Sequence, residues 1–139
     1  MAELNWTQTN VGPGGLKDCA VRAWTYATGE EYSAVLTELQ RHDDLVRRRP
    51  VDIQQKGTQI AAMRRFAAAR GWRWMDAAGH WEGSVYHNPP LAAENLPEGL
   101  VVAITTRHAV AVQDFTLMDE YDSRNNSGEL MGWFYQPAV

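Results

Sequence analysis

The sequence predicts an α+β fold in which N-terminal helices pack on a C-terminal antiparallel β-sheet. Three amphipathic helical patterns lie between residues 18 and 71, and four runs of strand-forming residues follow residue 98. Helices followed by strands that short polar turns connect are typical of an α+β layout rather than of an alternating α/β fold. The chain has 139 residues, of which 45% are hydrophobic, so residues 1–139 are expected to form a single domain.

The first helix is expected to begin after Asp18, a residue type that favours the N-cap position. Residues 1–16 are expected to form a loop, since glycine and proline cluster at residues 12–15. An apolar face with helical spacing follows Asp18, formed by Ala20, Ala23, Trp24 and Ala27. Gly29 suits the position just past the end of this helix, because glycine readily adopts the left-handed conformation found there.

Two further helices are expected before residue 72. Thr28 and Glu31 have the spacing of a capping box and predict a second helix that ends before Pro50. Its apolar stripe consists of Tyr32, Val35, Leu36 and Leu39. The third helix is expected to start near Thr58 and to stop at Gly71. Its inward residues would be Ile60, Met63, Phe66 and Ala67.

Strand-forming patterns begin after the third helix. Residues 72–75 form a short candidate strand, and residues 76–98 are expected to form a long loop rich in glycine, proline and aromatic residues. Four longer candidate strands cover residues 99–107, 108–114, 116–122 and 129–136. Long loops in small domains often carry function, so Trp81 and Tyr86 are candidate walls of a substrate cleft.

The charge is unevenly distributed along the chain. The formal net charge is −4, yet residues 41–73 contain nine of the 13 basic residues and only three acidic ones. These basic residues are Arg41, Arg47, Arg48, Arg49, Lys56, Arg64, Arg65, Arg70 and Arg73. The segment has no aromatic residues at stacking intervals and no known binding motif, so it is expected to form solvated helix faces. Its sequence does not favour nucleic acid as a partner.

Other classes of protein are excluded or disfavoured. A single cysteine cannot form a disulfide within the chain, and it does not complete a four-ligand zinc site with four scattered histidines. His80 and His87, seven residues apart, lack further visible metal ligands, so no metal or organic cofactor is implied. No apolar run approaches about 18 residues, and the N-terminal residues lack a signal-peptide pattern. A cytoplasmic protein without membrane contacts is therefore expected.

Cys19 and His108 are the candidate catalytic residues. Cys19 follows the capping position and lies in the first turn of a helix, where free N–H groups and the helix dipole stabilise a thiolate. His108 opens an apolar strand and could take and return a proton. An imidazole in this role needs a third group to orient it, and the following strand contains Asp119 and Asp122.

The segments GLKDCAVRAWTYATGEEY and HAVAVQDFTLMDEYDSR resemble the papain-like cysteine peptidase superfamily. They are most similar to small bacterial and bacteriophage members with a DCxxRA-type helix start and a late histidine strand. The resemblance implies a papain-like fold and a catalytic triad of Cys19, His108 and Asp119. For a phage-encoded member it implies action in the cytoplasm of the bacterial host.

The choice between Asp119 and Asp122 depends on strand register. If Asp114 and Phe115 form a two-residue turn, His108 faces Tyr121 and Asp119 lies on the same side of the sheet. A three-residue loop at residues 115–117 favours Asp122 instead. Papain-type enzymes also supply an oxyanion donor from a glutamine whose position corresponds to Pro13 here. Gln8 and Asn10 are the candidate replacements.

The expected function is a cysteine peptidase or amidase. Cys19 would attack a peptide, isopeptide or related amide bond in a protein or peptide substrate and form an acyl-enzyme. The same groups can transfer the acyl chain to an amine. The alternative is a catalytically weak or inactive papain-like phage protein that binds and inhibits a host protein. That partner would contact the basic segment or the tryptophan-rich loop.

Overall fold

A six-stranded sheet forms the centre of the protein, with the strand order β1-β5-β4-β3-β6-β2. The computed structural model describes residues 3–13, 16–78 and 88–137. The strands are β1 (Asn5–Gln8), β2 (Arg73–Asp76), β3 (Leu100–Thr105), β4 (Ala109–Gln113), β5 (Thr116–Asp119) and β6 (Leu130–Tyr135). The helices are α1 (Cys19–Thr28), α2 (Tyr32–Arg47), α3 (Ile53–Lys56) and α4 (Ile60–Ala69), and a 3₁₀ turn covers Ala93–Asn95. The fold is thus mixed α+β, as expected.

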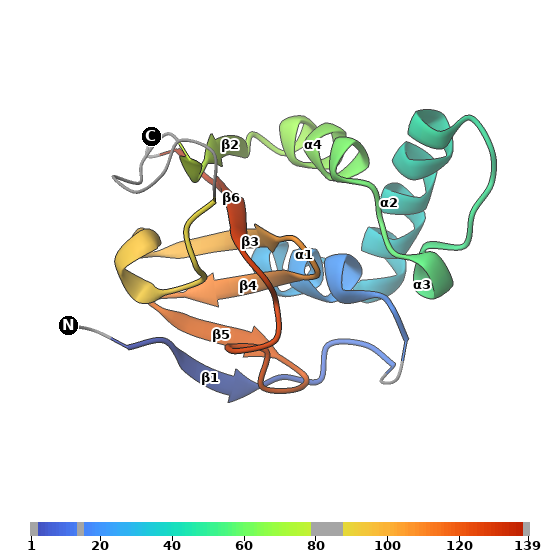
Figure 1. Ribbon diagram of the computed structural model, residues 1–139. Helices are drawn as coiled ribbons and strands as arrows, with labels where there is room; N and C mark the ends of the chain where they lie inside the picture. The colour runs from blue at the N-terminus through green and yellow to red at the C-terminus, as the bar shows by residue number, and fades with distance from the viewer. Residues whose placement is uncertain (1–2, 14–15, 79–87, 138–139) are drawn as a thin grey trace.

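The sheet is antiparallel except at one edge, where β1 pairs parallel to β5. Figure 1 shows β1 in blue beside the orange β5. The prediction of a loop over residues 1–16 is therefore wrong at residues 5–8. The reason is that β1 is short and mostly exposed and lacks a buried face that alternation would reveal. Its pairing depends on an edge strand more than 100 residues away, and only the half-buried Trp6 packs against the core.

Hydrophobic side chains cover both faces of the sheet. On one face α1 crosses β3 and β4, as Figure 1 shows, and the fully buried Trp24 packs among the rings of Phe66, Trp72 and Phe134. The centroid of the Trp24 ring lies 5.2–5.3 Å from those of its three neighbours. A second cluster covers the other face and includes Val110, Val112, Leu117 and Trp133. The predicted inward face of the first helix is confirmed, since Ala20, Ala23 and Trp24 are buried.

The helix boundaries differ from the predicted ones at two places. Thr28 does not cap α2; its hydroxyl donates to the carbonyl of Trp24 and closes α1, while Glu31 holds the N-cap position of α2. The connection after α2 contains the short helix α3, which begins where the Asp52 carboxylate accepts from the Gln54 N–H. A four-residue helix carries too little periodicity to be predicted. No helix in the described part of the chain has the length and apolarity needed to cross a bilayer.

The basic segment is only partly a solvated surface. Arg49 is exposed, but the Nε of Arg47 lies 2.6 Å from the Oδ2 of Asp43, which is fully buried. The other oxygen of Asp43 accepts from the N–H of Gln59, and Arg47 also donates to the carbonyl of Gly57. These bonds attach the end of α2 to the start of α4.

Replacing Arg47 should therefore destabilise the fold more than replacing its neighbour. Arg47→Gln is expected to lower the free energy of unfolding by about 3 kcal/mol, because the carboxylate of Asp43 stays buried without its cation. Arg49→Gln removes the same charge at an exposed site and should change that free energy by less than about 0.5 kcal/mol. Denaturant unfolding of the two variants measures the difference. Equal effects would contradict a structural role for the pair.

Candidate active site

Cys19 is the first residue of α1, and its side chain is half-buried at the helix N-terminus. Asp18 occupies the N-cap position as predicted, but its side chain makes no capping hydrogen bond. Its carboxylate is instead paired with the guanidinium of Arg22 and accepts the hydroxyl of Tyr32. The first N–H groups of α1 are consequently not consumed by the Asp18 side chain. They remain positioned to act on negative charge at this helix end.

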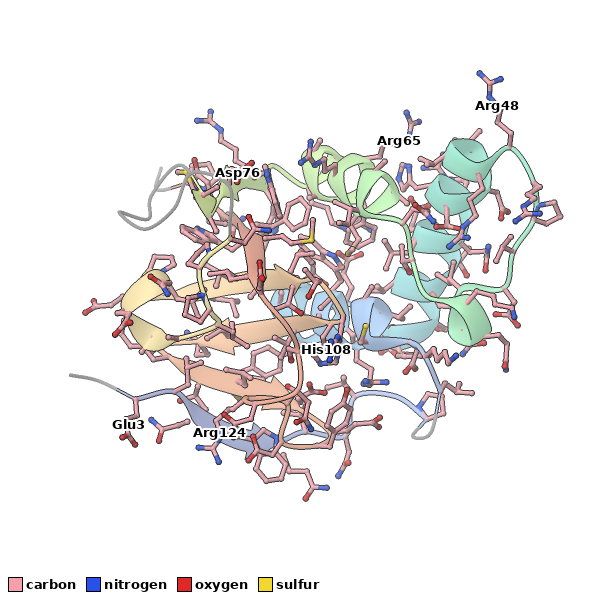
Figure 2. The ribbon with its side chains drawn as sticks, viewed as in Figure 1. Glu3, Arg48, Arg65, Asp76, His108 and Arg124 are labelled. Carbon is pink, nitrogen blue, oxygen red and sulfur yellow. The ribbon has the colours of Figure 1, made fainter. Side chains whose placement is uncertain are left out.

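His108 lies in the turn between β3 and β4, immediately before β4 begins. The N–H and the hydroxyl of Thr105 both bond to the His108 carbonyl, at 2.9 and 3.2 Å, so the backbone of this turn is fixed. The side chain of His108 is almost fully buried. Figure 2 shows it in the middle of the molecule, beside the blue start of α1.

The register of the β4–β5 hairpin brings Asp119 to His108. Asp114 and Phe115 form a two-residue turn with φ values of 47° and 66°, and Gln113 pairs with Thr116, which is the first of the two registers that the sequence allowed. Asp119 then lies diagonally across from His108 on the same side of the hairpin. The Nε2 of His108 is 2.5 Å from the Oδ2 of Asp119.

Asp122, the alternative orienting residue, is not brought to His108. Its half-exposed carboxylate forms an ion pair with Arg124 at 2.7 Å. The three-residue loop that would have favoured Asp122 does not form, because Asp114 and Phe115 both adopt the left-handed conformation that a tight hairpin turn requires.

The carboxylate of Asp119 is saturated with partners besides His108. The hydroxyl of Ser123 donates to Oδ2 at 2.8 Å, and the N–H of Glu120 donates to Oδ1 at 2.8 Å. Arg22 approaches Oδ1 to 3.8 Å. Sequence reasoning missed Ser123 and Arg22. The only sequence signal for Arg22 was its place in the DCxxRA motif, and that motif does not indicate which carboxylates the arginine contacts.

The charges of the three candidate residues depend on one another. Burial raises the pKa of the Cys19 thiol, but the hydrogen bond and charge of His108, the N–H of Ala109 and the charge of Arg22 outweigh burial and leave it lowered. Burial lowers the pKa of His108, yet its bonds to Asp119 and Cys19 raise it to about 9. Because Asp119 occupies Nε2, the nitrogen left for the thiol is Nδ1, which the hydroxyl of Tyr121 also approaches to 3.5 Å. A thiolate–imidazolium pair is the state that these contacts favour.

A cavity of about 250 Å³ lies beside Cys19 and His108. Its walls come from the start of α4, the turn between β3 and β4, and β6. Apolar side chains dominate the walls, namely Ile60, Met63, Ile104 and Met131. Arg107 adds a positive charge to the cavity wall.

Trp81 and Tyr86, the predicted cleft walls, lie outside the described residues, as do His80 and His87.

The two candidate oxyanion donors follow each other closely at the end of β1. Gln8 pairs with Asp119, and its side-chain amide donates to the Glu120 carbonyl at 3.3 Å. The N–H of Thr9 donates to the carbonyl of Asp119, so Asn10 leaves β1 directly beside the orienting strand. Asn10 is exposed and makes no hydrogen bond with another described residue. Neither side chain has a contact that joins it to Cys19 in the described part of the chain.

No group that could hold a metal ion is found in residues 3–13, 16–78 and 88–137. None of these residues forms a cluster of three or more histidine, cysteine, aspartate or glutamate side chains suited to that role.

The raised pKa of His108 can be measured directly. Its charged imidazole stabilises the fold fully below about pH 6.5, the ordinary value, and this contribution is lost as the pH rises through about 9. In NMR titrations, Cys19→Ala and Asp119→Asn should each lower the pKa of His108, because each removes a group that favours the charged form.

His42 provides the internal control in the same spectra. Burial and the charges of Arg41 and Arg65 lower its pKa, and neither substitution should move it. If His108 of the unaltered chain titrates at or below pH 6.5, the proposed charge pairing is wrong.

Comparison with known proteins gives no relative for this chain. No family model matches it, and no curated protein matches it. No solved structure matches it either.

Proposed function

We propose that the protein is a papain-like cysteine hydrolase that cleaves amide bonds in peptides or proteins through an acyl-enzyme on Cys19. One observation carries the proposal: a thiol at a helix N-terminus lines the same cavity as an imidazole whose Nε2 lies 2.5 Å from a buried carboxylate. Nucleophile, proton carrier and orienting group are then in the order that thiol hydrolases use.

The first half of the reaction forms the acyl-enzyme. The thiolate of Cys19 attacks the carbonyl carbon of the scissile amide, and the carbonyl electrons move onto oxygen. The oxyanion then reforms the carbonyl, the C–N bond breaks, and the imidazolium of His108 gives its proton to the leaving nitrogen. Asp119 holds the ring in place, since its carboxylate accepts from Nε2 and leaves Nδ1 for the proton transfers.

The second half regenerates the thiolate. Neutral His108 removes a proton from water, and the hydroxide attacks the thioester carbonyl. The C–S bond then breaks, the carboxylic acid is released and the imidazolium pairs again with the thiolate. An amine in place of water would give acyl transfer by the same steps.

The surroundings of the site support a peptide substrate and a papain-like arrangement. A helix supplies the nucleophile, and a later hairpin supplies the histidine and its carboxylate, as in the superfamily that the sequence resembles. The 250 Å³ cavity beside the pair has mostly apolar walls, which suit an apolar side chain of the substrate.

Thiol labelling and peptide cleavage test the proposal. At pH 6 an ordinary thiol is almost wholly protonated, whereas iodoacetamide should label Cys19 rapidly because its pKa is lowered. Cys19→Ala and His108→Ala should each abolish cleavage of a pool of fluorogenic peptide amides while the circular dichroism spectrum stays unchanged. Asp119→Asn should lower the cleavage rate less than these two substitutions do.

Asp122→Asn is the matched control for Asp119→Asn. It removes the same charge from a residue three positions away that contacts Arg124 rather than His108, so cleavage should be unaffected. Slow labelling of Cys19 at pH 6 would contradict the hydrolase. A Cys19→Ala protein that still performs the biological task would favour the binding protein that inhibits a host factor.

The oxyanion donor can be identified by comparing Asn10→Ala with Gln8→Ala. The amide of Gln8 is already bonded to Glu120, so we expect Asn10 to donate to the oxyanion together with the N–H of Cys19. Asn10→Ala should then reduce peptide cleavage by about 10²–10³-fold. The alkylation of Cys19 by iodoacetamide should be unchanged in the Asn10→Ala variant, because that reaction forms no oxyanion. Loss of cleavage in Gln8→Ala alone would assign the role to Gln8.

A further inference from the structure

Arg22 is a buried cation that contacts carboxylates on both sides of the candidate active site. It lies on α1 about one turn after Cys19, and its side chain is only 7% exposed. One terminal nitrogen pairs with Asp18 and lies 3.4 Å from Glu120, and the other lies 3.8 Å from Asp119. A single side chain therefore joins the start of the cysteine helix to the end of β5.

Asp18 makes such a cation necessary. Its carboxylate is fully buried and directly precedes Cys19 in the chain. Besides Arg22 it is held by the hydroxyl of Tyr32, which itself accepts from the amide of Gln54 at 3.1 Å. A buried negative charge next to the nucleophile opposes a second negative charge on the sulfur. The neutral hydroxyl of Tyr32 does not cancel that charge, whereas the guanidinium of Arg22 does.

We propose that Arg22 is a positioning residue for the reaction: it offsets the charge of Asp18 and ties the cysteine helix to Asp119, so that Cys19 is held as a thiolate in line with His108. The proposal rests on the proposed function, since it concerns the state of the same nucleophile. Arg22 acts through Asp18 and Asp119 and need not touch the substrate.

The charged groups around the sulfur come from each element that surrounds it. The turn before β4 contributes His108 and Arg107, which line the same cavity as Cys19. The end of β5 and the residues after it contribute Asp119, Glu120 and Tyr121. α1 and the residue before it contribute Arg22 and Asp18. Without Arg22, the carboxylates of Asp18, Asp119 and Glu120 would lose the guanidinium that they share. Arg22 is thus the cation that balances this group, and its charge also favours the thiolate directly.

The pH dependence of Cys19 alkylation by iodoacetamide tests the inference, because a purely structural role would change the unfolding temperature without moving this profile. In Arg22→Gln the pH at which the alkylation rate of Cys19 begins to rise (the acid limb of the profile) should shift up by one pH unit or more. The alkylation rate at pH 6 should fall tenfold or more. The double variant Asp18→Asn/Arg22→Gln should recover most of that loss, because both charges of the pair are then gone. Arg22→Lys keeps the positive charge but cannot bridge the carboxylates of Asp18 and Asp119. Its alkylation rate at pH 6 should therefore lie between those of the unaltered chain and Arg22→Gln.

Two further variants keep the test decisive. Arg124→Gln removes an equal charge from a half-exposed pair and should leave the profile unchanged, which controls for net charge. Asp18→Asn keeps Arg22 and should shift the acid limb down, so it decides the question if Arg22→Gln does not fold.

The outcomes separate this inference from the proposed function. If the unaltered chain shows the profile of an ordinary thiol, the proposed function fails and this inference fails with it. If the unaltered chain has a reactive thiol at pH 6 but Arg22→Gln and Asp18→Asn both keep its profile, only the role of Arg22 is overturned.

Discussion

The hydrogen bond between His108 and Asp119 determines how the other groups of the site are used. With Nε2 bound to a buried carboxylate, Nδ1 is the ring nitrogen left for the proton exchange with Cys19 that we propose. Both partners are nearly excluded from water, where a charge-assisted bond is strongest and an unpaired charge is most costly. The hydroxyl of Ser123 and the N–H of Glu120 also donate hydrogen bonds to the carboxylate, so Asp119 is held in one orientation.

Packing between α1 and the sheet sets how closely Cys19 approaches the turn that holds His108. The facing residues are small, with Ala20 on the helix and Ala109 and Ala111 on β4 all buried. Because their side chains are short, the helix approaches the strand closely, and Cys19 and Ala109 line the same cavity. The ring of Trp24 then fills the space farther along the helix and prevents it from shifting. The position of the thiol beside His108 therefore depends on apolar packing as well as on charge.

The sequence predicted most elements and the central contact of the site because their signals are local. Apolar periodicity over residues 20–27 and 60–67 marks two helices, and the strand patterns after residue 98 mark the sheet. Asp114 and Phe115 between two strand patterns predict a tight turn. A turn length sets the register of a hairpin and thereby the side of the sheet on which Asp119 lies. The sequence allowed two turn lengths, one favouring Asp119 and the other Asp122, and the family resemblance implied Asp119; the two-residue turn of the structure brings Asp119 to His108.

Only the tertiary structure decided contacts between segments that are distant in sequence. β1 is a strand because it pairs with the edge strand β5. A short, mostly exposed segment has no sequence pattern that predicts such a pairing. Asp18 looked like a helix cap, yet its carboxylate turns to Arg22 and Tyr32. A capping preference is local, whereas the partner of a buried charge depends on every group that folding brings within reach. The sequence by itself therefore determined which residues are candidates for the site, and the three-dimensional fold decided which charged groups surround them.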